Sequence, residues 1–125
     1  MGQRIRIIAG KVTLDAELND SKTAQLIGAA LPIEASANTW GDEIYFAIAV
    51  KMGADNPKEV VQIGDLGYWP VGHAFCIFFG PTPASRNAEE IRPASAVNIV
   101  GRVLGDARKL KVVGDGEPVT LESAK

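Results

Sequence analysis

Short segments in which apolar and polar residues alternate recur along the chain, and turns rich in glycine or proline separate them. In residues 12–18 (VTLDAEL) every second residue is apolar, the pattern of a strand with one face inward and one face in water. Residues 4–8 precede this segment across an Ala-Gly-Lys turn, so the two are predicted to form a hairpin. Further strands are predicted at residues 33–38, 43–50, 60–63, 74–80, 97–104 and 118–122.

Only two short helices accompany these eight strands. One is predicted at residues 22–30, after the capping sequence Asn-Asp-Ser, and the other at residues 107–110, after Asp106. Two short helices cannot cover both faces of so much sheet, so the sheet is expected to close on itself. The prediction is a mainly β protein, a closed eight-stranded β-barrel capped by two short α-helices, with residues 1–125 as one domain.

Composition excludes several classes of function. Thirteen basic and fifteen acidic residues give a net charge of -2, which argues against a nucleic-acid partner. No apolar run approaches the ~20 residues of a membrane span, and the N-terminus lacks the core of a signal peptide, so a cytoplasmic protein without a membrane partner is expected. Cys76 is the only cysteine and lies in an apolar run, where a buried, unreactive thiol is predicted.

Two of the predicted strands, residues 43–50 and 74–80, are apolar on both faces, which is typical of a strand covered on both sides or facing a ligand. Residues 64–72 between them, with three glycines, are predicted to be irregular and carry two large aromatic side chains. The candidate ligand-binding residues are Tyr45, Phe46, Gln62, Tyr68, Trp69, His73, Phe78, Phe79 and Arg86. The alternatives are that these aromatic side chains form the core or bury a homodimer contact. No phosphate loop or metal-ligand spacing is found, so no cofactor, metal or catalytic residue is assigned.

Three segments together resemble the small prokaryotic (bacterial or archaeal) cyclophilin-like proteins: WGDEIYF at residues 40–46, QIGDLGYWPVGHAFCIFFGPTPAS at residues 62–85, and VNIVGRVLGD at residues 97–106. The resemblance covers nearly the whole chain. It implies a closed eight-stranded cyclophilin-like barrel with a helix over each end, in a family without an assigned biochemical function.

True cyclophilins are peptidyl-prolyl isomerases with an outer groove lined by aromatic residues, a glutamine and a catalytic arginine. The resemblance implies that Gln62, in Gln-Ile-Gly-Asp, matches the glutamine of that groove. The arginine would lie eight residues earlier, where this chain has Ala54. Arg86 or Arg102 would have to replace it.

The leading expectation is therefore a binding module for a small molecule or an extended peptide, without efficient prolyl isomerase activity. A weak prolyl isomerase is the first alternative. The second is a component or relative of an amide-ring hydrolase of the oxoprolinase or allophanate hydrolase type, in which cyclophilin-like barrels also occur; this link is one of fold alone.

Overall fold

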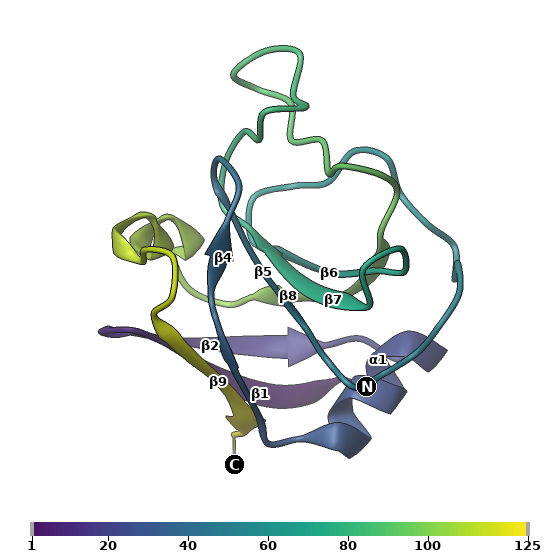
Figure 1. Cartoon of the computed structure of the whole chain (residues 1–125). Helices are drawn as coiled ribbons and strands as arrows, with labels where there is room; N and C mark the ends of the chain where they lie inside the picture. The colour runs from purple at the N-terminus through teal and green to yellow at the C-terminus, as the bar shows by residue number, and fades with distance from the viewer. Residues whose placement is uncertain (1, 125) are drawn as a thin grey trace.

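The computed structural model of the chain describes residues 2–124 and contains one sheet of nine strands with two short helices (Figure 1). The strands are β1 (Gln3–Ala9), β2 (Val12–Leu18), β3 (Ile33–Ser36), β4 (Asn38–Thr39), β5 (Glu43–Ala47), β6 (Asp65–Trp69), β7 (Ala74–Phe78), β8 (Asn98–Val103) and β9 (Pro118–Ser123). The helices are α1 (Lys22–Ala30) and η1 (Ala107–Val112). The strands pair in the order β3-β9-β1-β2-β8-β6-β7-β5-β4, and every pairing is antiparallel.

The two ends of this sheet are consecutive in the chain, which is how the barrel comes close to closing. β3 pairs with β9, β4 pairs with β5, and only Ala37 lies between β3 and β4. The amide of Ala37 still donates to the carbonyl of Glu117, at 2.8 Å. Residues 33–39 therefore join both edges, and the mainly β, barrel-shaped fold predicted from the sequence is confirmed. The expected count of eight strands is wrong by one, because the single strand predicted there is divided in two.

One strand of the barrel was placed wrongly by the sequence. The strand predicted at residues 60–63 is only an isolated bridge between Val61 and Ile91, whereas the segment predicted to be irregular contains β6. Gly67 lies at the centre of β6, where a Cβ atom would come within 3.0 Å of Val97 and 3.3 Å of Phe78. Glycine therefore serves close packing at this position, although it was interpreted as a sign of a loop.

The pairing of β6 with β8 is irregular next to Gly101. β6 pairs Leu66 with Gly101 but the next residue, Gly67, with Ile99, so β8 has one additional residue at this point. A Cβ atom on Gly101 would lie 2.1 Å from the carbonyl oxygen of Glu17 in β2. The absence of a side chain lets these two strands pair.

The helices lie on opposite sides of the barrel (Figure 1). Ser21 caps α1 by accepting a hydrogen bond from the amide of Ala24 at 3.2 Å, as the capping sequence predicted. Asp106 accepts a hydrogen bond from the amide of Arg108 at 3.1 Å and caps η1, but η1 is a 3-10 helix and not the second α-helix that was expected. No helix within residues 2–124 is long and apolar enough to cross a bilayer.

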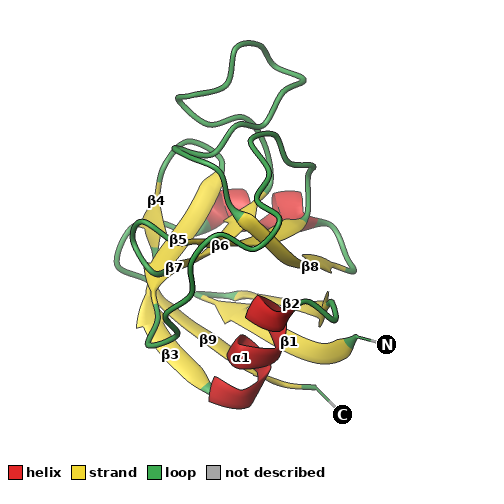
Figure 2. Ribbon diagram, turned by 90° about the vertical axis from the view of Figure 1, so that its right-hand side faces the viewer, coloured by secondary structure: helices red, strands yellow, loops and turns green. Residues whose placement is uncertain are grey.

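Apolar side chains form two clusters, one on each face of β5 and β7. The larger fills the barrel, where the rings of Phe46 and Phe75 stack with centroids 5.6 Å apart. The smaller lies outside the barrel and is built on Cys76 and Phe78, with Val97 over them. Figure 2 shows the long loops that project from this half of the barrel. The two-sided apolar strands of the sequence thus have one face in each cluster.

Candidate functional site

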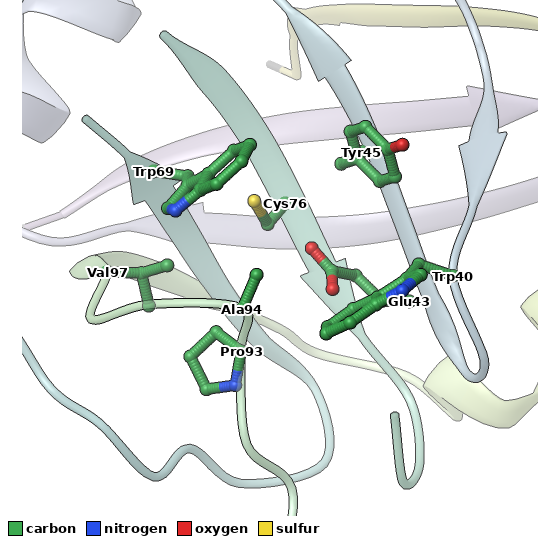
Figure 3. Close-up of a pocket in the computed structure, with 8 residues that line it drawn as sticks. All are labelled: Trp40, Glu43, Tyr45, Trp69, Cys76, Pro93, Ala94 and Val97. Atoms are coloured by element: carbon green, nitrogen blue, oxygen red, sulfur yellow. The ribbon is translucent and has the colours of Figure 1, made fainter. Parts of the chain in front are cut away.

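A cavity of about 210 Å³ opens on the outer face of the barrel, beside the smaller apolar cluster (Figure 3). We call it the outer pocket. Its lining is mostly apolar and aromatic, and consists of Trp40, Glu43, Tyr45, Trp69, Cys76, Pro93, Ala94 and Val97. Its volume exceeds the ~150 Å³ of an engineered apolar cavity that holds benzene, so a ligand with one ring and a short substituent can enter.

The strand register brings the floor of the outer pocket together. Tyr45 of β5 lies opposite Cys76 of β7, and Glu43 lies opposite Phe78. Since side chains two residues apart on a strand share a face, Glu43, Tyr45 and Cys76 all point outward. Figure 3 shows the carboxyl of Glu43 near the centre of the lining residues, directed toward the space between Cys76 and Ala94.

Trp40 is placed over this floor by the tight turn between β4 and β5. The amide of Trp40 donates to the carbonyl of Glu43, at 3.0 Å. Gly41 within the turn has a φ of 60°, and a Cβ atom there would lie 2.8 Å from the ring of Pro83. Only glycine fits that backbone conformation and that space, so the sequence Trp-Gly-Asp-Glu itself sets one wall of the pocket.

Trp69 forms the opposite wall and is fixed on both sides. Its indole Nε1 donates to the hydroxyl of Ser95 at 2.5 Å, which ties the end of β6 to the loop that carries Pro93 and Ala94. A Cβ atom on Gly72 would lie 2.7 Å from the indole ring, so the turn after β6 packs directly on it. The indole therefore has a defined position before any ligand arrives.

The loop wall is anchored by a second group of hydrogen bonds. The buried hydroxyl of Thr82 donates to the carbonyl of Arg92, and the amide of Arg92 donates to Ser85 Oγ at 3.1 Å. The guanidinium of Arg92 is 3.0 Å from the carboxylate of Glu90. These contacts hold the chain next to Pro93, which is itself buried.

Glu43 gives the outer pocket its chemistry. Glu43 is only 5% exposed. Burial raises the pKa of its carboxyl from 4.5 to about 7, and the interaction with the Cys76 thiol lowers that pKa in part. Burial, and then the charge of Glu43, raise the pKa of the thiol well above its usual value. The thiol also lies 3.8 Å from the carbonyl oxygen of Ala74. A thiol held in its protonated form is a poor nucleophile, so the pair is not an activated cysteine.

The residues predicted from the sequence are distributed over several places. Tyr45 and Trp69 line the outer pocket, and Phe78 lies buried in the cluster beside it. Phe46, Tyr68 and Phe79 belong to the barrel interior and are at most 3% exposed, so they contribute no surface to the pocket. The structure therefore brings two of the predicted residues together at one cavity.

The remaining three predicted residues are exposed on loops. His73 lies in the turn between β6 and β7 with a φ of 50°, and Arg86 lies in the loop after β7. Gln62 lines a separate depression with Pro81 and Ile91, and its backbone amide donates to Asp65 Oδ2 at 2.8 Å. None of these three side chains lines the outer pocket.

Ala54, at the position where the resemblance implies the isomerase arginine, lies on an exposed loop away from the outer pocket. The adjacent Asp55 holds this loop against α1 and β8: its carboxylate accepts from the Thr23 hydroxyl at 2.8 Å, and its amide donates to Asn98 Oδ1 at 2.8 Å. The carbonyl of Gly53 accepts from Asn98 Nδ2 at 3.0 Å. These hydrogen bonds hold the loop that contains Ala54 against α1 and β8, and not beside the outer pocket.

Most residues of the pocket lining were not predicted from the sequence. Trp40 was interpreted only as part of a turn, Cys76 only as a buried hydrophobe, and the loop residues Pro93 and Ala94 carried no signal. Glu43 could have been found, because it begins a strand that is apolar on both faces and lies two residues before Tyr45 on the outward face. A carboxyl in such a strand is unusual enough to mark a site.

A nearly closed barrel with its ligand-sized pocket on the outer face and a short helix on either side defines a cyclophilin-type fold. A family model described as cyclophilin-like matches residues 3–122, and the chain belongs to this family.

Solved structures agree with this assignment. The chain is 45% identical to the hypothetical protein AF2241 from Archaeoglobus fulgidus, with a TM-score of 0.82 over 98% of this chain and 95% of that one. It also resembles McbB, solved in complex with tryptophan, at 17% identity and a TM-score of 0.72. That match covers 95% of this chain but 44% of McbB, and at such low identity it shows the fold alone. No protein of curated function matches the chain significantly in sequence.

Proposed function

We propose that this protein is a small-molecule binding module of the cyclophilin-like class, that its binding site is the outer pocket, and that it lacks efficient prolyl isomerase activity. The observation that carries the proposal is the pocket itself. It is concave, walled by Trp40 and Trp69, and has one buried polar group, Glu43, at its floor. An apolar cavity with a single well-placed polar group is the usual design of a small-ligand site.

The pocket favours a small ligand over an extended peptide. Its walls are made by two indole rings and a buried proline, and its volume of about 210 Å³ suits one ring-sized group better than several residues of an extended chain. Trp69 and its loop are already fixed by the hydrogen bond to Ser95, which lowers the entropic cost of binding.

The same geometry argues against efficient prolyl isomerisation. The uncatalysed rotation has a barrier of ~18–20 kcal/mol, and a cation near the prolyl nitrogen is the main catalytic device that the cyclophilin resemblance implies. Among the described residues, none with a basic side chain lines the outer pocket or the separate depression beside Gln62. Ala54 offers no cation and lies elsewhere, which supports a binding role over a catalytic one.

The proposal is tested by fragment binding followed through amide chemical shifts. The library contains equal numbers of neutral, cationic and anionic one-ring fragments. Some are expected to shift the amides of Glu43, Tyr45 and Cys76, with weaker binding in Ala94→Phe, which narrows the pocket from the loop side. Ala88→Phe, at an exposed position of the same long connection, is the matched control and should bind as the natural protein does.

If no fragment of any charge class shifts the pocket amides, or if Ala94→Phe binds the same fragments equally well, the outer pocket is not a binding site. The isomerase alternative is measured separately with a protease-coupled assay on an Ala-Pro peptide. The expected rate equals that of the uncatalysed reaction. A clear acceleration would show that the protein is a prolyl isomerase.

A further inference from the structure

We infer that the ligand class of the outer pocket is a small organic ammonium ion, whose charged head contacts the carboxylate of Glu43 and whose apolar body lies between the indoles of Trp40 and Trp69. This inference rests on the binding function proposed above and specifies its ligand. It follows from three independent features of the pocket: a buried carboxyl without a cationic partner, aromatic walls, and the absence of competing positive charge among the lining residues.

The first feature is the carboxyl. Glu43 is 5% exposed, yet no ion pair joins it to a basic side chain anywhere in residues 2–124. The polar side chain that interacts with it is the thiol of Cys76, a weak donor. Buried carboxylates in proteins are normally paired or hydrogen-bonded by several donors. The fold has already buried most of Glu43, so a ligand that brings a positive N–H group recovers part of that cost and bears mainly its own desolvation.

The second feature is the aromatic lining. The ring of Trp40 lies beside the Glu43 carboxyl, and Trp69 and Tyr45 stand across the pocket (Figure 3). The faces of aromatic rings attract cations, most strongly for tryptophan and most strongly in sites removed from water. One carboxylate surrounded by three aromatic rings is thus suited to a cation that also has an apolar surface.

The third feature is the pattern of charge around the pocket. Two basic side chains adjoin lining residues and are both paired: Lys111 lies 3.6 Å from Asp42, the neighbour of Glu43, and Arg92, the neighbour of Pro93, lies 3.0 Å from Glu90. An anionic ligand would therefore meet the charge of Glu43 without a compensating cation in the lining. This repulsion in a buried site selects against carboxylates and phosphates.

Binding of such a cation depends on the ionisation of Glu43. The titratable groups that face Glu43 are Cys76 of β7 and Tyr45 of its own strand, and Asp42 at the turn is paired with Lys111 of η1. None of the loop residues in the lining is titratable. Since burial raises the pKa of Glu43 to about 7, the carboxylate form that a cation requires becomes dominant only above neutral pH.

The experiment compares two ligands that differ mainly in charge, benzylammonium and benzyl alcohol, with benzoate as the anionic comparison. Dissociation constants are measured from amide chemical shifts at pH 6, 7 and 8, a range in which an aliphatic amine stays protonated. Glu43→Gln removes the charge and keeps the side-chain shape. Glu34→Gln, on an exposed position of β3, removes an equal charge far from the pocket and is the matched control.

At pH 8 we expect benzylammonium to bind the pocket at least about tenfold more tightly than benzyl alcohol, and benzoate not to bind. The affinity for benzylammonium should rise about tenfold from pH 6 to pH 8, since the ionised fraction of a group with a pKa of about 7 rises by that factor. The preference for the cation should disappear in Glu43→Gln and persist in Glu34→Gln.

The outcomes separate this inference from the function on which it rests. Equal binding of benzylammonium and benzyl alcohol, or a cation preference that survives in Glu43→Gln, would overturn the inference that Glu43 selects an ammonium ligand. The outer pocket would then still be a binding site, but for another class of ligand. If no fragment of any charge binds there, the binding function itself is overturned. Because the pH series uses the natural protein, the test stands even if Glu43→Gln does not fold.

Discussion

We expect the buried carboxyl of Glu43 to make stability depend on pH, in addition to any effect on binding. Its pKa is raised from 4.5 to about 7 in the folded protein, so the folded state binds the proton more tightly than the unfolded state does. Stability must therefore fall as pH rises from the unfolded value toward the folded one, and remain lower above it. Glu43→Gln removes this titration while it keeps the size and shape of the side chain.

The magnitude follows from the two pKa values. Integration of the linkage relation between pH 5 and pH 8 gives a loss of roughly 2–3 kcal/mol for the natural protein that the Gln variant does not share. Below about pH 4 the difference between the two proteins should stop changing, because both states then bind the proton. The natural protein should thus lose stability relative to Glu43→Gln as the solution becomes alkaline.

The assay is urea unfolding of both proteins at pH 4, 5, 6, 7 and 8, followed by tryptophan fluorescence, with Glu34→Gln as the control. The quantity of interest is the difference in the free energy of unfolding between Glu43→Gln and the natural protein at each pH. A difference that stays constant from pH 5 to pH 8, or that changes equally in Glu34→Gln, would show that the carboxyl of Glu43 is not held in a buried, unpaired state.

Three further predictions concern the barrel. Tyr68→Phe should lower the free energy of unfolding by about 1–3 kcal/mol, because the phenol donates to the buried carbonyl of Val50 at 2.7 Å; urea unfolding measures this, and an unchanged midpoint would contradict it. Gly101→Ala should lower the free energy of unfolding by at least ~2 kcal/mol, because the added Cβ would lie 2.1 Å from a backbone oxygen of β2. Gly114→Ala is the control, since open space surrounds that position, and should change the free energy of unfolding far less. Equal effects of the two substitutions would refute the packing argument. Cys76 is 1% exposed and its pKa is raised, so a thiol reagent such as DTNB should react with the folded protein only at the rate of its opening and rapidly in urea; fast reaction without urea would show an accessible thiolate.

The sequence predicted the fold well where local pattern and local chemistry agree. The first hairpin and α1 were found because alternation, a glycine turn and a capping serine all indicate the same elements. β6 was missed because Gly67 is there to admit Val97 and Phe78 from other parts of the chain. Local sequence does not distinguish a glycine that allows a turn from one that allows close packing.

The site was predicted less well, for a related reason. Alternation identified the two strands that form its floor, but whether an aromatic residue on such a strand points into the barrel or out of it depends on the register. Phe46 and Tyr45 are neighbours, and only Tyr45 faces the outer pocket. The loop that brings Pro93 and Ala94 to the pocket is set by long-range contacts such as the one between Trp69 and Ser95, which no local pattern encodes.

The two sides of the outer pocket differ in how much the stability of the barrel depends on them. The strand side, with Glu43 and Cys76, is also the wall of the barrel, so substitutions there affect the integrity of the whole domain. The facing side is irregular chain, attached through a few hydrogen bonds, and Ala94 is exposed on it. Ligand specificity can therefore change through substitutions in this one connection while the barrel stays the same, as antigen-binding loops vary on a constant framework.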